Sequence, residues 1–149
     1  MTFLATGNAM EALVDAVIPV LRGDSALSAL LGGSTKVYTK VPEAQRTAHP
    51  YVKLSDPTLT DDFGGMGTGG GKVTFELDVW GRTPHTVHEV LARVAVVLER
   101  RDLTLAHHEL AGGSLHCTEA RVFDEPDPDK PEDVLVHGHQ QWEALVDEA

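Results

Sequence analysis

The sequence is poor in cysteine, in basic residues and in long hydrophobic runs. Its single cysteine, Cys117, excludes an internal disulfide, which suits a reducing cytoplasm. No stretch approaches the ~18 apolar residues of a membrane-spanning helix. The start of the chain lacks the basic residues and apolar run of a signal peptide. We therefore expect a fold held by its hydrophobic core, with no disulfide scaffold and no membrane contact.

The shortage of basic residues leaves the chain strongly acidic. It has 12 lysines and arginines against 23 aspartates and glutamates, a formal net charge of -11. Lysine and arginine supply most of the affinity for a phosphate backbone, so this balance opposes static nucleic-acid binding. The ordinary interpretation of the charge is solubility. The length, 149 residues, fits a single domain spanning residues 1–149.

Three segments have the apolar spacing of an amphipathic helix. Asn8 and Glu11 form a capping-box pattern at the start of the first segment. Asp24 is placed to cap the second, and Thr83-Pro84 places a cap and an initial proline at the third. The predicted helices cover about residues 9–22, 25–31 and 84–100.

Strands are predicted where β-branched residues are frequent or alternate with polar ones. The clearest runs from Val73 to Trp80, where strict alternation predicts one buried face. Gly138 is interpreted as marking a β-bulge in the last strand. The segment 103–110 is ambiguous, and the proline-rich segment 125–133 is expected to be irregular. The predicted strands cover about residues 36–41, 51–55, 73–80, 115–123 and 134–145.

This order of elements predicts an α+β fold. We expect a mainly antiparallel sheet of about four to five strands, with two main helices packed on one face. The segment 57–71, which contains the run GGMGTGGG, is predicted to be a long flexible loop. It is either a spacer or a loop that becomes ordered only against a partner. In the second case the candidate interface residues are Asp61, Asp62, Phe63, Gly64, Met66, Gly69 and Gly70.

Eight histidines raise the question of a metal site. The pair His137 and His139 on a strand would place two imidazoles on one face, as zinc requires. A structural zinc site usually has two closely spaced ligand pairs, and the sequence offers one. We therefore predict no metal and no other cofactor, with the histidines at the surface or paired across strands. The candidate ligands considered are His107, His108, His116, Cys117, His137 and His139.

Motifs for catalysis are missing as well. Cys117 and His116 are adjacent, so on a strand they face opposite sides and form no nucleophile–base pair. The sequence Gly67-x-Gly69 leads into a strand and not a helix, so it forms no phosphate-binding loop. Carboxylates such as Asp61-Asp62 lie in predicted loops with no apolar pocket to raise a pKa. We predict that the protein is not an enzyme.

Several segments, taken in order, resemble one family. They are GDSALSALLGG, HPYVKLSD, KVTFELDVWGRTPHTVHEVLARVAVVLE and LVHGHQQWEALV. This pattern is similar to the tail terminator, or tail-completion, proteins of long-tailed (siphophage-type) bacteriophages and gene transfer agents. The resemblance covers nearly the whole chain, from about Ala9 to Val146. The glycine run at 64–71 and the histidine-rich C-terminal third depart from the family pattern.

The resemblance implies a structural protein of the virion tail and neck, assembled in the host cytoplasm. It implies a hexameric ring that caps the tail tube, ends tail polymerisation and joins the tail to the head connector. The expected partners are further copies of the chain, the major tail tube protein and the head–tail connector or stopper protein. DNA would pass through the lumen without specific binding, and an acidic lumen suits that passage because it repels phosphate.

Two other hypotheses stay open at this point. One is another head–tail joining protein of the neck, such as a stopper or an adaptor. The other, from a different class, is a small cytoplasmic metal-binding or hydrolytic domain built on the histidines. That second hypothesis predicts zinc in the purified protein and loss of folding with a chelator.

Overall fold

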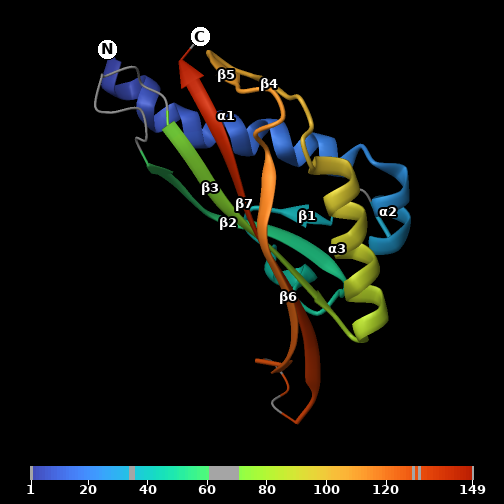
Figure 1. Cartoon of the computed structure of the whole chain (residues 1–149). Helices are drawn as coiled ribbons and strands as arrows, with labels where there is room; N and C mark the ends of the chain where they lie inside the picture. The colour runs from blue at the N-terminus through green and yellow to red at the C-terminus, as the bar shows by residue number, and fades with distance from the viewer. Residues whose placement is uncertain (1, 34–35, 61–70, 129, 131, 149) are drawn as a thin grey trace.

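The computed structural model describes residues 2–33, 36–60, 71–128, 130 and 132–148. Three α-helices, one short 3-10 helix and seven strands build the described chain (Figure 1). The helices are α1 (Thr2–Arg22), α2 (Ser25–Leu31), η1 (Glu43–Gln45) and α3 (Pro84–Leu98). The strands are β1 (Val37–Tyr38), β2 (Tyr51–Thr60), β3 (Gly71–Gly81), β4 (Thr104–Leu105), β5 (His108–Leu110), β6 (His116–Pro126) and β7 (Val134–Glu148).

The strands form one mixed, curled sheet in which β7 is the central strand. The order is β1-β2-β3-β7-β5-β4, and β6 pairs with β7 beyond this path. β1 runs parallel to β2, and the other pairs are antiparallel. β7 is long enough to pair along one edge with β3 and along the other with both β5 and β6. The right-handed twist of such long strands curls the sheet.

The predicted fold is therefore wrong. We expected a mainly antiparallel sheet of about four to five strands with two main helices, and the structure has seven strands, a parallel pair and three α-helices. The additional strands β4 and β5 form a short hairpin within the ambiguous segment 103–110. Strands of two or three residues carry too few side chains to show a periodic pattern, so the sequence could not reveal them.

Several element boundaries also differ from the prediction. α1 begins at Thr2, upstream of the capping-box pattern at Asn8. β2 continues through Pro57 to Thr60, with a register shift between Ser55 and Thr58, and β3 begins at Gly71, so residues 57–60 and 71 of the predicted loop belong to strands. The rest of the predicted loop, residues 61–70, lies outside the described residues.

No described helix is long and apolar enough to cross a membrane.

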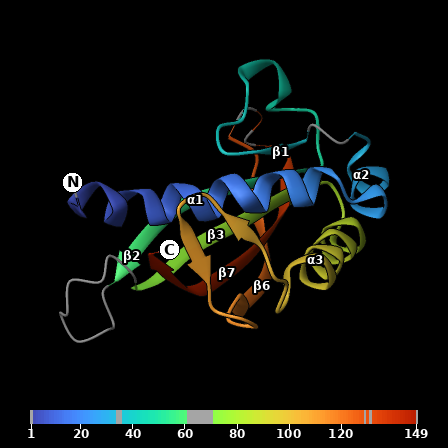
Figure 2. The same ribbon diagram turned by 90° about the horizontal axis from the view of Figure 1, so that it is seen from above.

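The core lies between the sheet and its helices. Val73, Phe75, Leu77 and Val79 of β3 are fully buried, which confirms the face predicted from their alternation. Figure 2 shows α1 lying across β2, β3 and β7, and α3 packs against β3, β6 and β7. Buried residues of both helices belong to one hydrophobic cluster with this face of the sheet. We call the side of the sheet that packs against α1 and α3 the helix face, and the opposite side the open face.

Gly138 marks a close approach of α3 to β7 and not a bulge. It pairs with Val79 on one side and Val122 on the other in unbroken register. A Cβ atom at this position would lie 2.6 Å from Val87 Cγ1 and 2.8 Å from Leu91 Cδ1. Only glycine lets the helix pack this closely. The irregularity predicted for β7 lies in its partner β6, between Cys117 and Glu119.

Replacing Gly138 with alanine is expected to lower the free energy of unfolding by about 1–3 kcal/mol, because the methyl group overpacks the helix–sheet contact. Urea unfolding measures this loss. Gly112→Ala is the matched control, since nothing lies within 4 Å of the added Cβ atom. In a Val87→Ala background the cost of Gly138→Ala should shrink, because the closest contact has been removed. A cost equal to that of Gly112→Ala would contradict the close packing.

Asp24 links α2 to α3. Its carboxylate accepts a hydrogen bond from the Leu27 backbone N–H at 2.9 Å, which caps α2 as predicted. It also accepts two hydrogen bonds from the Arg93 guanidinium, each 2.8 Å long. The hydrogen bonds from Arg93 are the main cause that lowers the pKa of Asp24 from 3.8 to about 2.

This lowered pKa predicts an acid-dependent loss of stability. The folded state holds Asp24 ionised, so its contribution is complete above pH 3.8 and is lost as the pH falls toward 2. Asp24→Asn keeps a capping side chain but cannot form the ion pair. The stability advantage of the wild type over Asp24→Asn should therefore be constant at neutral pH and disappear near pH 2. Urea unfolding of both proteins across this range checks it, and a constant difference would contradict the ion pair.

Candidate functional site

The open face carries a row of rings that crosses four strands. Tyr51 of β2 lies opposite Trp80 of β3, Trp80 opposite His137 of β7, and His137 opposite Phe123 of β6. The centroids of the neighbouring rings lie 5.6, 4.5 and 4.6 Å apart along this row. Contacts of this kind stabilise paired strands. The row thus holds the imidazole of His137 between Trp80 and Phe123.

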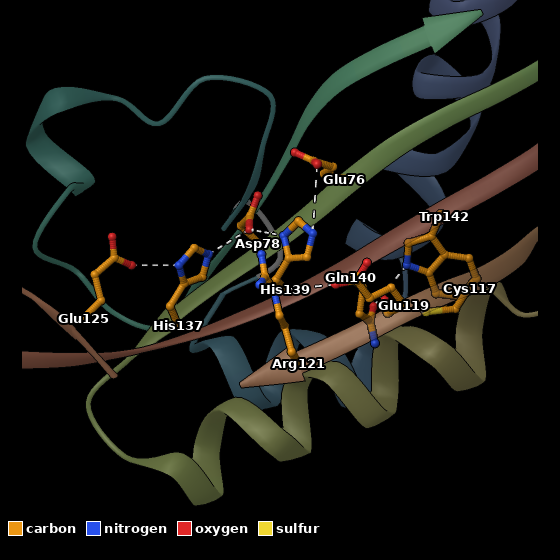
Figure 3. A network of polar contacts seen from close by, with 10 residues as sticks. All are labelled: Glu76, Asp78, Cys117, Glu119, Arg121, Glu125, His137, His139, Gln140 and Trp142. Atoms are coloured by element: carbon orange, nitrogen blue, oxygen red, sulfur yellow. Dashed lines mark hydrogen bonds and ion pairs between the residues drawn. The ribbon is translucent and has the colours of Figure 1, made fainter. Parts of the chain in front are cut away.

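A polar network lies beside this row, two residues along β3 and β7 (Figure 3). Asp78 lies opposite His139 in register. One oxygen of Asp78, Oδ1, is 2.7 Å from His137 Nε2 and 2.8 Å from His139 Nδ1. Both imidazoles donate to this single carboxylate oxygen, so two residues that are distant from Asp78 in the sequence converge on it.

Two further carboxylates contact the outer nitrogens of these histidines. Glu125 Oε2 of β6 lies 2.7 Å from His137 Nδ1. Glu76 Oε1 of β3 lies 4.0 Å from His139 Nε2. Each imidazole therefore has one nitrogen directed at Asp78 and the other directed at an acidic side chain. We call the five residues Glu76, Asp78, Glu125, His137 and His139 the open-face network.

The network is partly buried. The pKa shifts of Asp78 and His137 show how the negative and positive charges in it stabilise each other. Burial on its own would raise the pKa of Asp78, but the hydrogen bonds and charges of His137 and His139 outweigh it and lower the pKa. Burial on its own would lower the pKa of His137, whereas Asp78 and Glu125 together raise it. The geometry thus favours an ionised Asp78 beside a positively charged His137.

A second feature lies at the edge of the sheet. A groove of about 760 Å³ runs between α3 and β6, with a mainly apolar lining. Its helix wall includes Ala92 and Ala95, and its strand wall includes Ala120 and Val122. Within the described part of the chain, β6 pairs only with β7. The outer edge of β6 is therefore open beside this groove.

The model of the family described as tail completion protein gp17 matches residues 15–147 of the chain. The chain belongs to this family. It is a structural tail-completion protein of the virion tail, as the sequence resemblance implied, and it assembles with other proteins of the tail.

A solved structure supports the same assignment. The tail-completion protein is similar to a chain of the structure titled "Virion of native gene transfer agent (GTA) particle", with 26% sequence identity and a TM-score of 0.77. The match covers 93% of this chain and 97% of that chain. No curated protein matches the sequence.

The candidate ligands named from the sequence divide into two groups in the tail-completion protein. His137 and His139 come together in the open-face network, as their spacing indicated. The others lie elsewhere: His116 Nδ1 is 2.8 Å from Glu99 Oε1, and His108 Nδ1 is 2.9 Å from the carbonyl oxygen of Ala106. Burial raises the pKa of the Cys117 thiol, which disfavours the nucleophilic thiolate.

Sequence reasoning missed the three carboxylates of the network, Glu76, Asp78 and Glu125. Asp78 appears in the sequence as one of several polar residues alternating along a strand, and nothing local marks its partner. The register between β3 and β7 brings it to His139. Glu125 was expected in an irregular segment, but β6 extends to Pro126 and carries it to His137. The proposed interface residues between 61 and 70 lie outside the described residues, so their role stays a prediction.

Proposed function

We propose that this tail-completion protein forms a closed hexameric ring that caps the tail tube, ends tail polymerisation and joins the tail to the head connector. The observation that carries the proposal is the open edge of β6 beside an apolar groove. The likeness to a chain of a virion particle over nearly its whole length supports it.

The open edge of β6 is a natural surface for assembly. The strand is 11 residues long, and most of its side chains are exposed. An unpaired edge of this length exposes backbone N–H and C=O groups that can pair with another chain. Proteins that remain monomeric usually cover or shorten such an edge. A neighbouring subunit would cover it in a ring.

The groove between α3 and β6 gives this contact its apolar part. We assign a second copy of the chain as its occupant, because a ring requires each subunit to present two different, complementary surfaces. The hairpin formed by β6 and β7 projects beyond the rest of the sheet (Figure 1) and exposes 57% of Val134. We propose that this projecting hairpin of one subunit packs into the groove of the next subunit.

The proposed ring also indicates the other proteins that the chain would contact. One rim would contact the major tail tube protein and the other the head–tail connector or stopper protein. Six chains carry six times the charge of -11, and a lumen lined by part of it repels phosphate, so DNA slides through without being held. The role requires no catalytic step, and we propose that the protein has no enzymatic activity.

Tube elongation in vitro tests the proposal. Purified protein is added to polymerising tail tubes of its own virion, and tube lengths are measured by electron microscopy. A terminator should stop elongation at one ring per tube end. A stopper or adaptor would leave elongation unchanged while still binding the connector, and that result would contradict the proposal.

The segment 61–70 remains a proposed contact with a neighbouring ring. If it contacts the neighbouring ring, deletion of residues 64–70, which leaves Gly71 of β3 in place, should lengthen or disorganise tails without lowering the stability of the free protein. Tail length in assembled particles and urea unfolding of the purified variant measure the two effects. Tails of normal length would show that the glycine run is a spacer.

A further inference from the structure

We propose that Asp78, His137 and His139 form a binding site for one divalent transition-metal ion, best suited to zinc. The sequence predicted no metal because it showed only one pair of closely spaced histidines. The fold supplies a third ligand from another strand. The ligand atoms of these three residues all lie within 4.8 Å of one another.

Two of the ligand atoms already face the third, Asp78 Oδ1. His137 Nε2 and His139 Nδ1 lie 2.7 and 2.8 Å from Asp78 Oδ1. In a zinc site with bonds of about 2.0–2.1 Å, neighbouring ligand atoms are separated by roughly 3.3 Å. An ion entering among them would lengthen both separations from Asp78 Oδ1 by roughly half an ångström. It would also bring the two imidazole nitrogens, which lie within 4.8 Å of each other, to about the same spacing. It would replace the hydrogen bonds that now link the imidazoles to the carboxylate, and the protons of these two N–H groups would be released to solvent.

The surroundings of the histidines match the outer shell of a metal site. A metal-bound imidazole usually donates its remaining N–H to a carboxylate, which fixes the orientation of the ring. His137 Nδ1 lies 2.7 Å from Glu125, and Glu76 lies 4.0 Å from His139 Nε2. Both outer nitrogens therefore have an acidic neighbour.

The site rests on paired strands and not on loops. Asp78 and His139 are direct partners in the β3–β7 register. The His137 ring is held between Trp80 and Phe123, with centroids 4.5 and 4.6 Å away. The ligand side chains are 11–13% exposed, so an ion can still enter from solvent.

The donor set indicates which ions fit. Two imidazole nitrogens and one carboxylate oxygen suit zinc and neighbouring transition metals, whereas calcium and magnesium prefer oxygen ligands throughout. Three protein ligands leave one position of a tetrahedral zinc ion for water or a partner residue. The ion would link β3 directly to β7 and, through Glu125, to the end of β6. Its effect would be to fix the base of the projecting hairpin.

Titration of the untagged full-length protein with Zn²⁺, and with Co²⁺ as a spectroscopic probe, tests this inference. We expect one ion per chain, visible absorption typical of four-coordinate Co²⁺, and a rise of roughly 5–10 °C in the melting temperature at zinc 100-fold above Kd. No stoichiometric binding by the wild type would overturn the site, whatever the variants do.

Variants locate the ion. His139→Gln and Asp78→Asn should lose the cobalt spectrum, and Glu125→Gln should weaken binding roughly 10- to 100-fold. His85→Gln is the matched control, since its side chain is 84% exposed on α3, and it should bind as the wild type does. Circular dichroism shows whether each variant is folded. Unchanged binding by a folded His139→Gln variant would place the ion elsewhere and contradict the proposal.

Discussion

Replacing Trp142 with alanine is expected to lower the free energy of unfolding by about 3–5 kcal/mol. Trp142 is fully buried on the helix face of β7. Its ring stacks with that of Phe75, with the two ring centroids 6.5 Å apart and an interplanar angle of 8°. Its indole N–H donates to Gln140 Oε1 at 3.1 Å, and Gln140 Nε2 donates to the carbonyl oxygen of Leu91 in α3 at 3.1 Å. Removing the ring leaves a cavity and breaks this link to α3.

Two controls separate these contributions. Trp142→Phe keeps most of the apolar volume but loses the indole N–H, so it should cost less than the alanine change. Trp80→Ala removes the same side chain from the open face, where Trp80 is only partly buried, and should also cost less. Urea unfolding of the three variants gives the comparison. A loss below about 1 kcal/mol for Trp142→Ala would contradict the central place of this residue in the core.

Placing arginine at Ala92 is expected to abolish ring formation and the termination of tail tubes. Ala92 is an exposed position of α3 that lines the groove beside β6. Arginine is a good helix former, so the fold should tolerate the change. Its long side chain would fill the groove and exclude the neighbouring subunit. The proposed ring contact should therefore be lost while the monomer stays folded.

Tail length in assembled particles and tube elongation with purified protein measure the effect. Ala26→Arg is the matched control, because it adds the same charge at an exposed alanine of α2 that does not line the groove. It should behave as the wild type. Normal termination by Ala92→Arg would exclude the groove as the surface that joins subunits, although the family assignment would stand.

The parts of the fold that were predicted correctly depend on local signals. Asp24 and Gly32 bound α2, and Thr83 and Pro84 begin α3, because capping side chains and glycine act within one turn of the chain. The alternation along β3 was clear because one face of the strand is buried throughout. These features require no knowledge of distant segments.

The parts that were missed depend on contacts between distant segments. β1 pairs with β2 in parallel over only two residues, and β4 and β5 are equally short, so their formation follows from neighbouring strands and not from their own pattern. Gly138 was interpreted as a bulge because its contact with Val87 and Leu91 comes from another element. A single sequence does not contain this information in a readable form.

The same limit applies to the candidate site. His137 and His139 were singled out correctly as a pair on one face of a strand, because that follows from strand periodicity alone. Asp78 joins them only through the register of β3 with β7, and Glu125 only through the length of β6. Family membership, in contrast, was predictable from the order of segments along almost the whole chain.

A reconstruction of the neck of the virion would test the central claim most directly. The account predicts six copies of this chain in one closed ring at the end of the tail tube. The β6 edge and the groove of each copy should be covered by the next copy. A reconstruction that places the chain elsewhere in the particle, or as single copies with the β6 edge uncovered, would contradict the proposed ring.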